Sequence, residues 1–212
     1  MARLAYADPS DVTQVMRPFP PPLRNMNIGR MLSHAPPLVA PYYTTYAAVL
    51  QGAELDPKLR QLAILRVAER ACASYVLAQH RPLARIAGLT DQQITAAGVP
   101  GFDSGCYWSE SRCFTHVQRH VLAFTDAVIA GPRVSDGLFE RIRDVLTRRE
   151  IVELLLVIGW YWTACRLTTT LEIEPEPALG HGVHAMLEIE QAKRSVKPAR
   201  AVARGELDPV HV

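Results

Sequence analysis

The sequence predicts an all-α protein, a bundle of about eight helices. Apolar residues recur at helical spacing through most of the chain, and residues that favour helix N-termini precede many of these runs. No segment alternates convincingly between apolar and polar residues with period two, as a half-buried strand would. Glycine-rich phosphate loops of the GxGxxG or GxxxxGK type are absent from the sequence. Its 212 residues, 49% of them hydrophobic, are enough for one sizeable core or two small ones.

The N-terminal region, residues 1–24, is rich in proline. Each proline fixes φ and removes a backbone donor, so we expect an extended arm here rather than a helix. Residues 25–34 predict a short helix, which the prolines at 36 and 37 bring to an end. A second helix is expected over 38–51.

The stretch 57–88 predicts a helical hairpin. Asp56 stands directly before Pro57, which is typical of an N-cap and a first helical turn, and the first helix is expected over 57–70. A small-residue break follows. Ser74 is then expected to cap a second helix that ends at Gly88.

The remaining chain predicts further helices, several of them preceded by a capping residue. Thr90 and Ser135 are expected N-caps, and Thr147 forms a capping box with Glu150 before the most apolar helix. The predicted ranges are 91 to near 98, 114–128, 136–146 and 148–170.

Three parts of the chain are expected from these patterns. They are the proline-rich arm (1–24), a helical domain (25–177), and a C-terminal helix with a flexible basic tail (178–212). Within the domain, residues 99–112 form a turn-rich loop that contains Cys106 and is expected to restrict access to a cavity.

Composition and charge narrow the classes of partner. The net charge of +2 gives no strong field for nucleic acid or a membrane. The first residues have no apolar signal region, and no apolar run reaches the roughly 18 residues that a membrane span needs. We therefore expect a cytoplasmic protein with a small-molecule substrate, and four cysteines that remain thiols.

His80 is the first candidate for chemistry, because imidazole titrates near neutral pH and can both accept and donate a proton. Tyr75 and Gln79 stand on the same predicted helix and are candidates for orienting a substrate carboxylate. The structural alternatives are a core histidine and a tyrosine that merely packs.

Two further candidates lie beside the break in the hairpin. Glu69 is a candidate catalytic carboxylate if the hairpin brings it near His80, and a surface ion pair is the alternative. Cys72 lies near a helix N-terminus, a position that favours the thiolate. No second cysteine stands three residues further on, so a CxxC redox pair is absent.

The helix 148–170 carries an aromatic cluster that includes Trp160 and Tyr161. With Arg166 following, this helix is a candidate lining for an aromatic pocket with one cation for an acidic group. Packing at a helix or subunit interface is the alternative. His116 and His120 have the i, i+4 spacing of metal ligands, but no Glu or Asp joins them in an HExxH arrangement, so no metal or cofactor is expected.

Residues 55–90, LDPKLRQLAILRVAERACASYVLAQHRPLARIAGLT, resemble the core hairpin of the carboxymuconolactone decarboxylase and alkylhydroperoxidase D-like (AhpD-like) superfamily. The family pattern is LDxxLRELxILRVA, then a Y-x-x-x-x-H helix, then AxxAGL. Residues 134–167 resemble the second block of the family, and NIGRMLSHAPPL resembles its opening helix. The resemblance implies an AhpD-like all-α fold that assembles as a dimer, trimer or hexamer. It also implies that His80 is the active-site histidine.

The sequence departs from the family at the residues that carry redox chemistry. In the peroxidase branch two cysteines precede the histidine by seven and four residues, and Ala73 and Val76 stand at those positions here. The acidic residue of the LRE motif is Gln61, and Cys72 is one residue out of register. These departures argue against a peroxidase.

The leading hypothesis is therefore a cofactor-free decarboxylase, lyase or isomerase that acts on a small carboxylic acid or lactone, with His80 as proton donor. A thiol-dependent peroxidase that uses Cys72 with Cys106 or Cys113 is one alternative. A non-catalytic oligomeric binding protein is the other.

Overall fold

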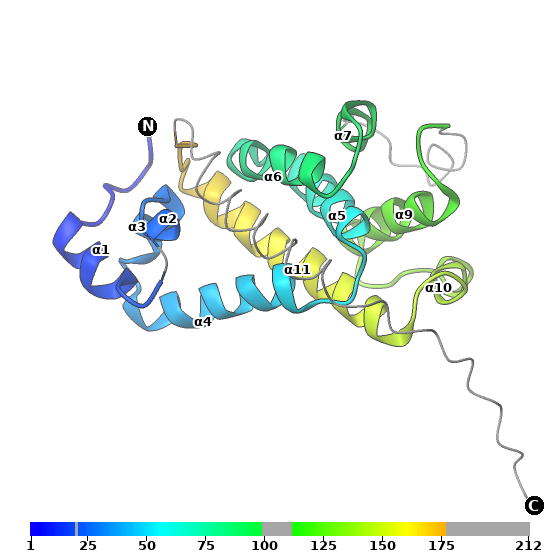
Figure 1. Ribbon diagram of the computed structural model, residues 1–212, viewed down its shortest axis with the longest axis horizontal. Coiled ribbons are helices and arrows are strands. Elements are labelled where there is room, and N and C mark those ends of the chain that lie inside the picture. Colours follow the sequence, from blue (N-terminus) through cyan, green and yellow to red (C-terminus); the bar gives the residue numbers. More distant parts are fainter. Residues whose placement is uncertain (20, 99–111, 177–212) are drawn as a thin grey trace, which may run out of the picture.

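The computed structural model describes residues 1–19, 21–98 and 112–176, and every regular element in that part is a helix (Figure 1). The α-helices are α1 (Pro9–Met16), α2 (Pro21–Arg24), α3 (Asn27–Leu32), α4 (Pro36–Ala47), α5 (Pro57–Arg70), α6 (Ser74–Ile86), α7 (Asp91–Ala97), α9 (His116–Ala130), α10 (Asp136–Arg143) and α11 (Arg148–Thr170). A π-helical segment, η1 (Ala48–Gly52), continues α4. The all-α prediction is confirmed. The predicted loop at 99–112 lies almost wholly outside the described residues, as do the last helix and the tail.

Helix α5 is the centre of the bundle and contacts α6, α7, α9 and α11. Residues 59–68 are all buried, which is typical of a helix enclosed on every side. Arg66 has no exposed surface, and its Nε lies 2.6 Å from Asp126 Oδ1 of α9. A buried guanidinium needs such a carboxylate, so this pair fixes α9 against α5.

The expectation of an extended N-terminal arm is wrong. Pro9 occupies the first turn of α1, where its missing N–H has no helical partner to lose. Val12, Met16 and Leu23 are buried in the main core, and α1 contacts α3 and α4. The N-terminal residues are therefore part of the bundle.

The same property of proline moves the start of α4. Pro36 and Pro37 end the stretch after α3 as predicted, but they also form the first turn of α4, two residues earlier than expected. Pro41 lies within the helix. The last turn, 48–52, winds as a π-helix before the chain turns into α5.

The predicted hairpin of α5 and α6 is confirmed, but its turn is not capped as expected. Cys72 has a positive φ of 51°. The Cys72 N–H donates to Glu69 O and the Ala73 N–H donates to Ala68 O, which is the Schellman arrangement. Ala73, not Ser74, is the N-cap residue of α6, and its side chain makes no capping bond. Glycine is favoured at the position that Cys72 occupies.

The other helix starts follow the predicted chemistry more closely. Asp56 accepts from the backbone N–H groups of Lys58 and Leu59 at the start of α5. Thr90 and Thr147 form complete capping boxes before α7 and α11, although Ser135 makes no side-chain bond before α10.

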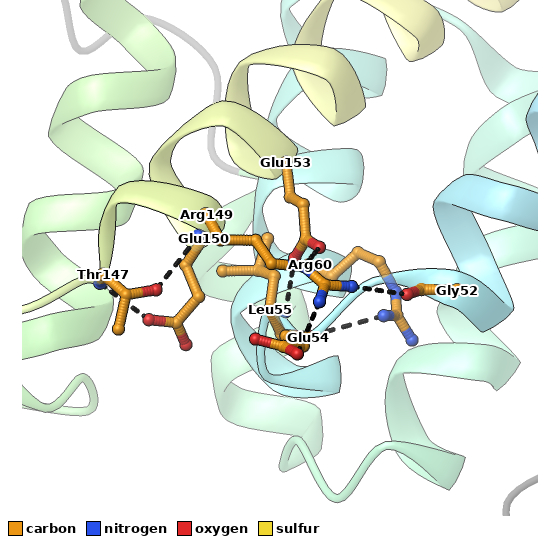
Figure 2. Close-up of polar contacts among 8 residues, drawn as sticks. All are labelled: Gly52, Glu54, Leu55, Arg60, Thr147, Arg149, Glu150 and Glu153. Atoms are coloured by element: carbon orange, nitrogen blue, oxygen red, sulfur yellow. Dashed lines mark hydrogen bonds and ion pairs between the residues drawn. The ribbon is translucent and has the colours of Figure 1, made fainter.

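The start of α11 is fastened to the loop that joins η1 to α5 (Figure 2). Glu153 accepts from the Leu55 backbone N–H at 2.8 Å and from Arg149 Nε at 2.8 Å. Arg149 also donates to Glu54 Oε1 at 2.5 Å and to the Gly52 carbonyl at 3.3 Å. We call these contacts the α11 clasp. They fix the beginning of α5 relative to α11.

Helix α11 is the one described helix that is long and apolar enough to cross a membrane by composition, a property that core helices of soluble proteins share. It contacts α5, α6 and α9, and 44% of its most apolar window is buried. Its outer face leaves Val152, Leu155 and Leu156 exposed. A surface groove of about 610 Å³ runs along this face and includes Trp160 and Thr163 in its lining.

Candidate functional site

A small cavity lies among α4, α6 and α11, with Ile28 of α3 also in its lining. The cavity volume is about 50 Å³. Water occupies about 30 Å³ per molecule in the liquid, whereas sites for small organic ligands measure roughly 300–1,000 Å³. A substrate of ordinary size therefore needs a neighbouring group to move.

His80 lines this cavity and is buried. Its Nδ1 lies 2.9 Å from Gln61 Oε1 of α5. Because an amide oxygen is an acceptor, Nδ1 carries the proton in this pair and donates it. Nε2 is then the nitrogen that changes its protonation in any reaction. The His80 ring meets Tyr161 edge to face, with 4.8 Å between centroids and an interplanar angle of 87°.

Three buried hydrogen-bond donors of the cavity lining have no partner within the described structure. They are Tyr43 Oη, Tyr161 Oη and Trp160 Nε1. Burial raises the pKa of both phenols well above the usual value, with neighbouring tyrosines adding to the effect. Both phenols therefore stay protonated at neutral pH. Such donors suit a ligand that brings oxygen acceptors.

Tyr75 and Gln79 lie one turn apart on α6 and also line the cavity. The Tyr75 hydroxyl donates to Glu176 Oε1 at 2.7 Å, and Gln79 Nε2 donates to Glu176 Oε2 at 2.8 Å. The backbone N–H of Asn27 also donates to Glu176 Oε1. Burial, and next the Glu176 carboxylate, raise the pKa of Tyr75 far above its usual value. These two residues do bind a carboxylate, and it belongs to the chain itself.

The structure brings five of the eight predicted site residues together: His80, Tyr75, Gln79, Trp160 and Tyr161. Arg166 lies elsewhere, because Trp162 and Arg166 share a different face of α11 from Tyr161. The exposed Arg166 guanidinium stacks 4.4 Å from the centroid of the Trp162 ring. Its expected place in the pocket is wrong.

Glu69 and Cys72 also lie outside the cavity lining. Glu69 is half-buried near the end of α5, with its carboxylate beside Gly98, the C-cap residue of α7. Cys72 is exposed and borders a different hollow of about 290 Å³, with Thr169 and Glu172 on its other side. The hairpin therefore does not bring Glu69 into the cavity of His80, and Cys72 does not line that cavity either.

Neither a disulfide nor a metal cluster is present among the residues that the structure describes. Cys72 and Cys165 are free thiols there. Burial raises the pKa of Cys165 to about 12, as expected of an inert core cysteine. His116 and His120 place their Nε2 atoms 2.8 Å apart, but no third metal-ligating residue joins them in the described ranges.

Three residues of the site are not predicted as site residues by the sequence: Gln61, Tyr43 and Glu176. Gln61 stands at the family's acidic position, yet its contact with His80 is a tertiary contact between two helices. Tyr43 lies on α4, whose helical spacing is visible in the sequence but whose packing partner is not. Glu176 gives no sequence signal.

Comparison with known proteins supports the same family as the sequence motifs. Residues 36–127 match the model of the Carboxymuconolactone decarboxylase family, a range that includes His80, Gln61 and Tyr75. The chain has no match among curated protein sequences.

Several solved structures share the fold. A protein of unknown function from Agrobacterium tumefaciens is 24% identical, with a TM-score of 0.60 over 69% of this chain and 95% of that one. An uncharacterised peroxidase-related protein from Ralstonia eutropha, with an alkylhydroperoxidase AhpD core, is 15% identical, with a TM-score of 0.67 over 84% and 94%. A cysteine-to-alanine variant of the debrominase Bmp8, in complex with 2,3,4-tribromopyrrole, is 14% identical, with a TM-score of 0.61 over 90% and 100%.

At these sequence identities, the structural similarity establishes only the fold. The family match covers the hairpin of α5 and α6. Residues 36–127 thus match the Carboxymuconolactone decarboxylase family, and the chain has an AhpD-like all-α fold.

Proposed function

We propose that the protein is a cofactor-free decarboxylase, lyase or isomerase that acts on a small carboxylic acid or lactone by proton transfer at His80. One observation carries the proposal: a buried histidine, held at Nδ1 by Gln61, lines a cavity that also holds unpartnered donors. A proton donor and oxygen-binding groups inside an apolar enclosure are what carbanion chemistry requires.

Decarboxylation of a β-keto acid illustrates the roles. The bond between the carboxylate carbon and the α-carbon breaks, CO₂ leaves, and the electron pair moves into the ketone to give an enolate. Tyr161 Oη or Trp160 Nε1 donates a hydrogen bond to the enolate oxygen. The imidazolium of His80 then transfers its Nε2 proton to the α-carbon. The neutral ring keeps its Nδ1–H on Gln61 and regains a proton from water.

The substrate body is expected to be aromatic or polyketide-like. Tyr42 and Trp160 pack with 4.5 Å between ring centroids at the cavity, so its walls are aromatic. The debrominase that shares the fold was crystallised with 2,3,4-tribromopyrrole. A small planar ring of that kind suits such walls.

The non-catalytic alternative rests on the volume of the cavity. A space of about 50 Å³ is nearly filled by side chains, which suits a protein that keeps the family's shape without its chemistry. The buried donors favour catalysis instead, because an unpartnered buried hydroxyl costs about 1–3 kcal/mol that a purely structural core has no reason to retain. For the thiol peroxidase, the exposed position of Cys72 outside the cavity offers no support.

The test is turnover of a panel of β-keto acids and lactone acids by wild type and by His80→Ala. We expect the variant to lose at least about 100-fold in kcat, the usual contribution of a general acid. His116→Ala is the matched control, because His116 is exposed on α9 and outside the cavity, and it should keep full activity. Unchanged turnover in His80→Ala would remove His80 from the mechanism.

A further inference from the structure

We propose that Tyr75 and Gln79 form the carboxylate subsite of the enzyme, and that Glu176 occupies this subsite until a substrate carboxylate displaces it. The proposal rests on the function proposed above and deepens it, because it assigns the substrate an anionic end and identifies the internal competitor for that end.

The contacts of Glu176 are those of a bound carboxylate ligand. Both carboxylate oxygens are engaged, Oε1 by the Tyr75 hydroxyl and Oε2 by Gln79 Nε2. The Asn27 backbone N–H adds a third donor. Tyr75 is 3% exposed, so its hydroxyl offers this bond from within the protein rather than from the surface. Hydrogen bonds to an ionised acceptor are about twice as strong as neutral ones, so these donors favour an anion. We call the donor groups of Tyr75, Gln79 and Asn27 the seat.

The donors of the seat belong to the cavity of His80. Tyr75 and Gln79 both line the cavity and both hold Glu176. A carboxylate that replaced Glu176 would therefore place the rest of its molecule against His80. The buried donors Tyr161 Oη and Tyr43 Oη would meet a second oxygen function on that molecule. The ligand class is thus a carboxylic acid with an apolar body and a further oxygen acceptor.

The residues that carry Glu176 are held in part by the N-terminal residues. We call Glu172–Glu176 the strap. Its side chains bond to the first residues of the chain: Arg3 Nε lies 2.8 Å from Glu172 Oε1, and the Tyr6 hydroxyl donates to Glu174 Oε2 at 2.8 Å. Ile173 is buried in the core and anchors the beginning of the strap. Glu176 follows this anchor by three residues, and the strap lies after the end of α11 at Thr170.

The small cavity supports this exchange. A substrate cannot enter a space of about 50 Å³ unless a group leaves, and Glu176 is a group of the right charge, held by the residues that should hold the substrate. Replacing one carboxylate by another leaves Tyr75 and Gln79 satisfied in both states. The exchange therefore leaves no buried donor of this pair without an acceptor.

The experiment measures binding rather than turnover, so it remains informative even if the proposed reaction is wrong. Benzoate is the probe and benzamide its uncharged counterpart, each titrated by calorimetry into wild type and Glu176→Gln. We expect benzoate to bind Glu176→Gln at least about tenfold more tightly than wild type, because the amide is a weaker competitor for the seat. Benzamide should show no such gain.

Glu140→Gln is the matched control, since it removes the same charge from an exposed ion pair with Arg143, outside both the strap and the cavity lining. Its affinity for benzoate should equal that of wild type. Tyr75→Phe in the Glu176→Gln background should abolish the gain. Equal benzoate affinity in wild type and Glu176→Gln, an equal gain in Glu140→Gln, or no binding to any variant would each overturn the proposal.

Discussion

Gln61 holds His80 through a neutral acceptor, where the family motif has an acidic residue. An amide oxygen 2.9 Å from Nδ1 fixes the orientation and tautomer of the ring without the added attraction that a carboxylate has for an imidazolium. A histidine so held releases its proton more readily than one beside an acid. The residue that departs from the family motif therefore tunes the group that we expect to do the chemistry.

Gln61→Glu tests this role. A carboxylate at the same position should favour the imidazolium, so the ring should titrate at higher pH than in wild type. The measurement is an NMR titration of the His80 ring, with the exposed His34 as internal reference. A midpoint that stays in place or moves to lower pH would show that the introduced carboxylate does not contact the ring.

At the residue scale, the sequence predicts which side chains are candidates for chemistry, but it does not predict their tertiary contacts. His80, Tyr75 and Gln79 are identifiable because their chemistry is local and visible in a motif. Glu69 is a candidate for the same reason and lies beside Gly98 instead. Contacts such as that of Gln79 with Glu176 join positions 97 apart in the chain, and no local pattern encodes them.

Helix starts are the most predictable elements, because a cap is a contact within one turn. Asp56, Thr90 and Thr147 all cap as their sequence context indicates. The prolines of α1 and α4 lead to wrong predictions, since proline both stops a helix and begins one, and the surrounding packing decides between the two. For α1, the packing of Val12 and Met16 in the core favours the helix.

The α11 clasp should make the stability of the fold depend on pH through Glu153. Burial acts to raise the pKa of Glu153, but the Leu55 backbone N–H and Arg149 outweigh burial and hold that pKa below its usual value. A carboxyl whose pKa is lower in the folded state stabilises the fold above its unfolded pKa, roughly 4.3. This contribution is lost as the pH falls through the folded pKa.

Glu153→Gln should therefore lower the free energy of unfolding by about 1 kcal/mol at pH 7, with the difference shrinking towards pH 3. Urea unfolding at the two pH values measures it. Glu140→Gln is the control, because its ion pair with Arg143 is exposed and should contribute little at either pH. A deficit of the same size at pH 3 would contradict the assigned role of the Glu153 charge.

For the whole molecule, we propose that the homo-oligomer expected from the family resemblance forms through the outer face of α11. Val152, Leu155 and Leu156 are exposed there, beside the groove of about 610 Å³. A continuous apolar surface of this kind is typical of a protein interface. A second copy of the chain would cover it.

Leu156→Lys is expected to shift the protein towards monomer, measured as molar mass by light scattering. Leu38→Lys is the control, since Leu38 is equally exposed at 61% but lies outside the groove lining. A monomeric wild type, or an oligomer that tolerates Leu156→Lys, would contradict the proposed interface.

The fold class is predictable because the periodicity of α5 and α11 extends over whole helices and the family motif covers the hairpin between α5 and α6. The arrangement of the chain ends is not predictable, because it depends on a few polar contacts between residues at the start of the chain and the strap. The residues that make those contacts follow no periodic pattern in the sequence. They are visible only once the bundle is assembled.

The bonds of Arg3 and Tyr6 to the strap have a consequence for how the enzyme's selectivity can change. Residues near the beginning of the chain hold the segment that competes with the substrate, yet neither Arg3 nor Tyr6 lines the cavity. A fusion partner, a protease cut or a substitution among the first six residues would therefore alter which acids gain entry while leaving the catalytic groups untouched. Under the proposed function and exchange, specificity and chemistry are separable, so each is open to evolution or engineering without the other.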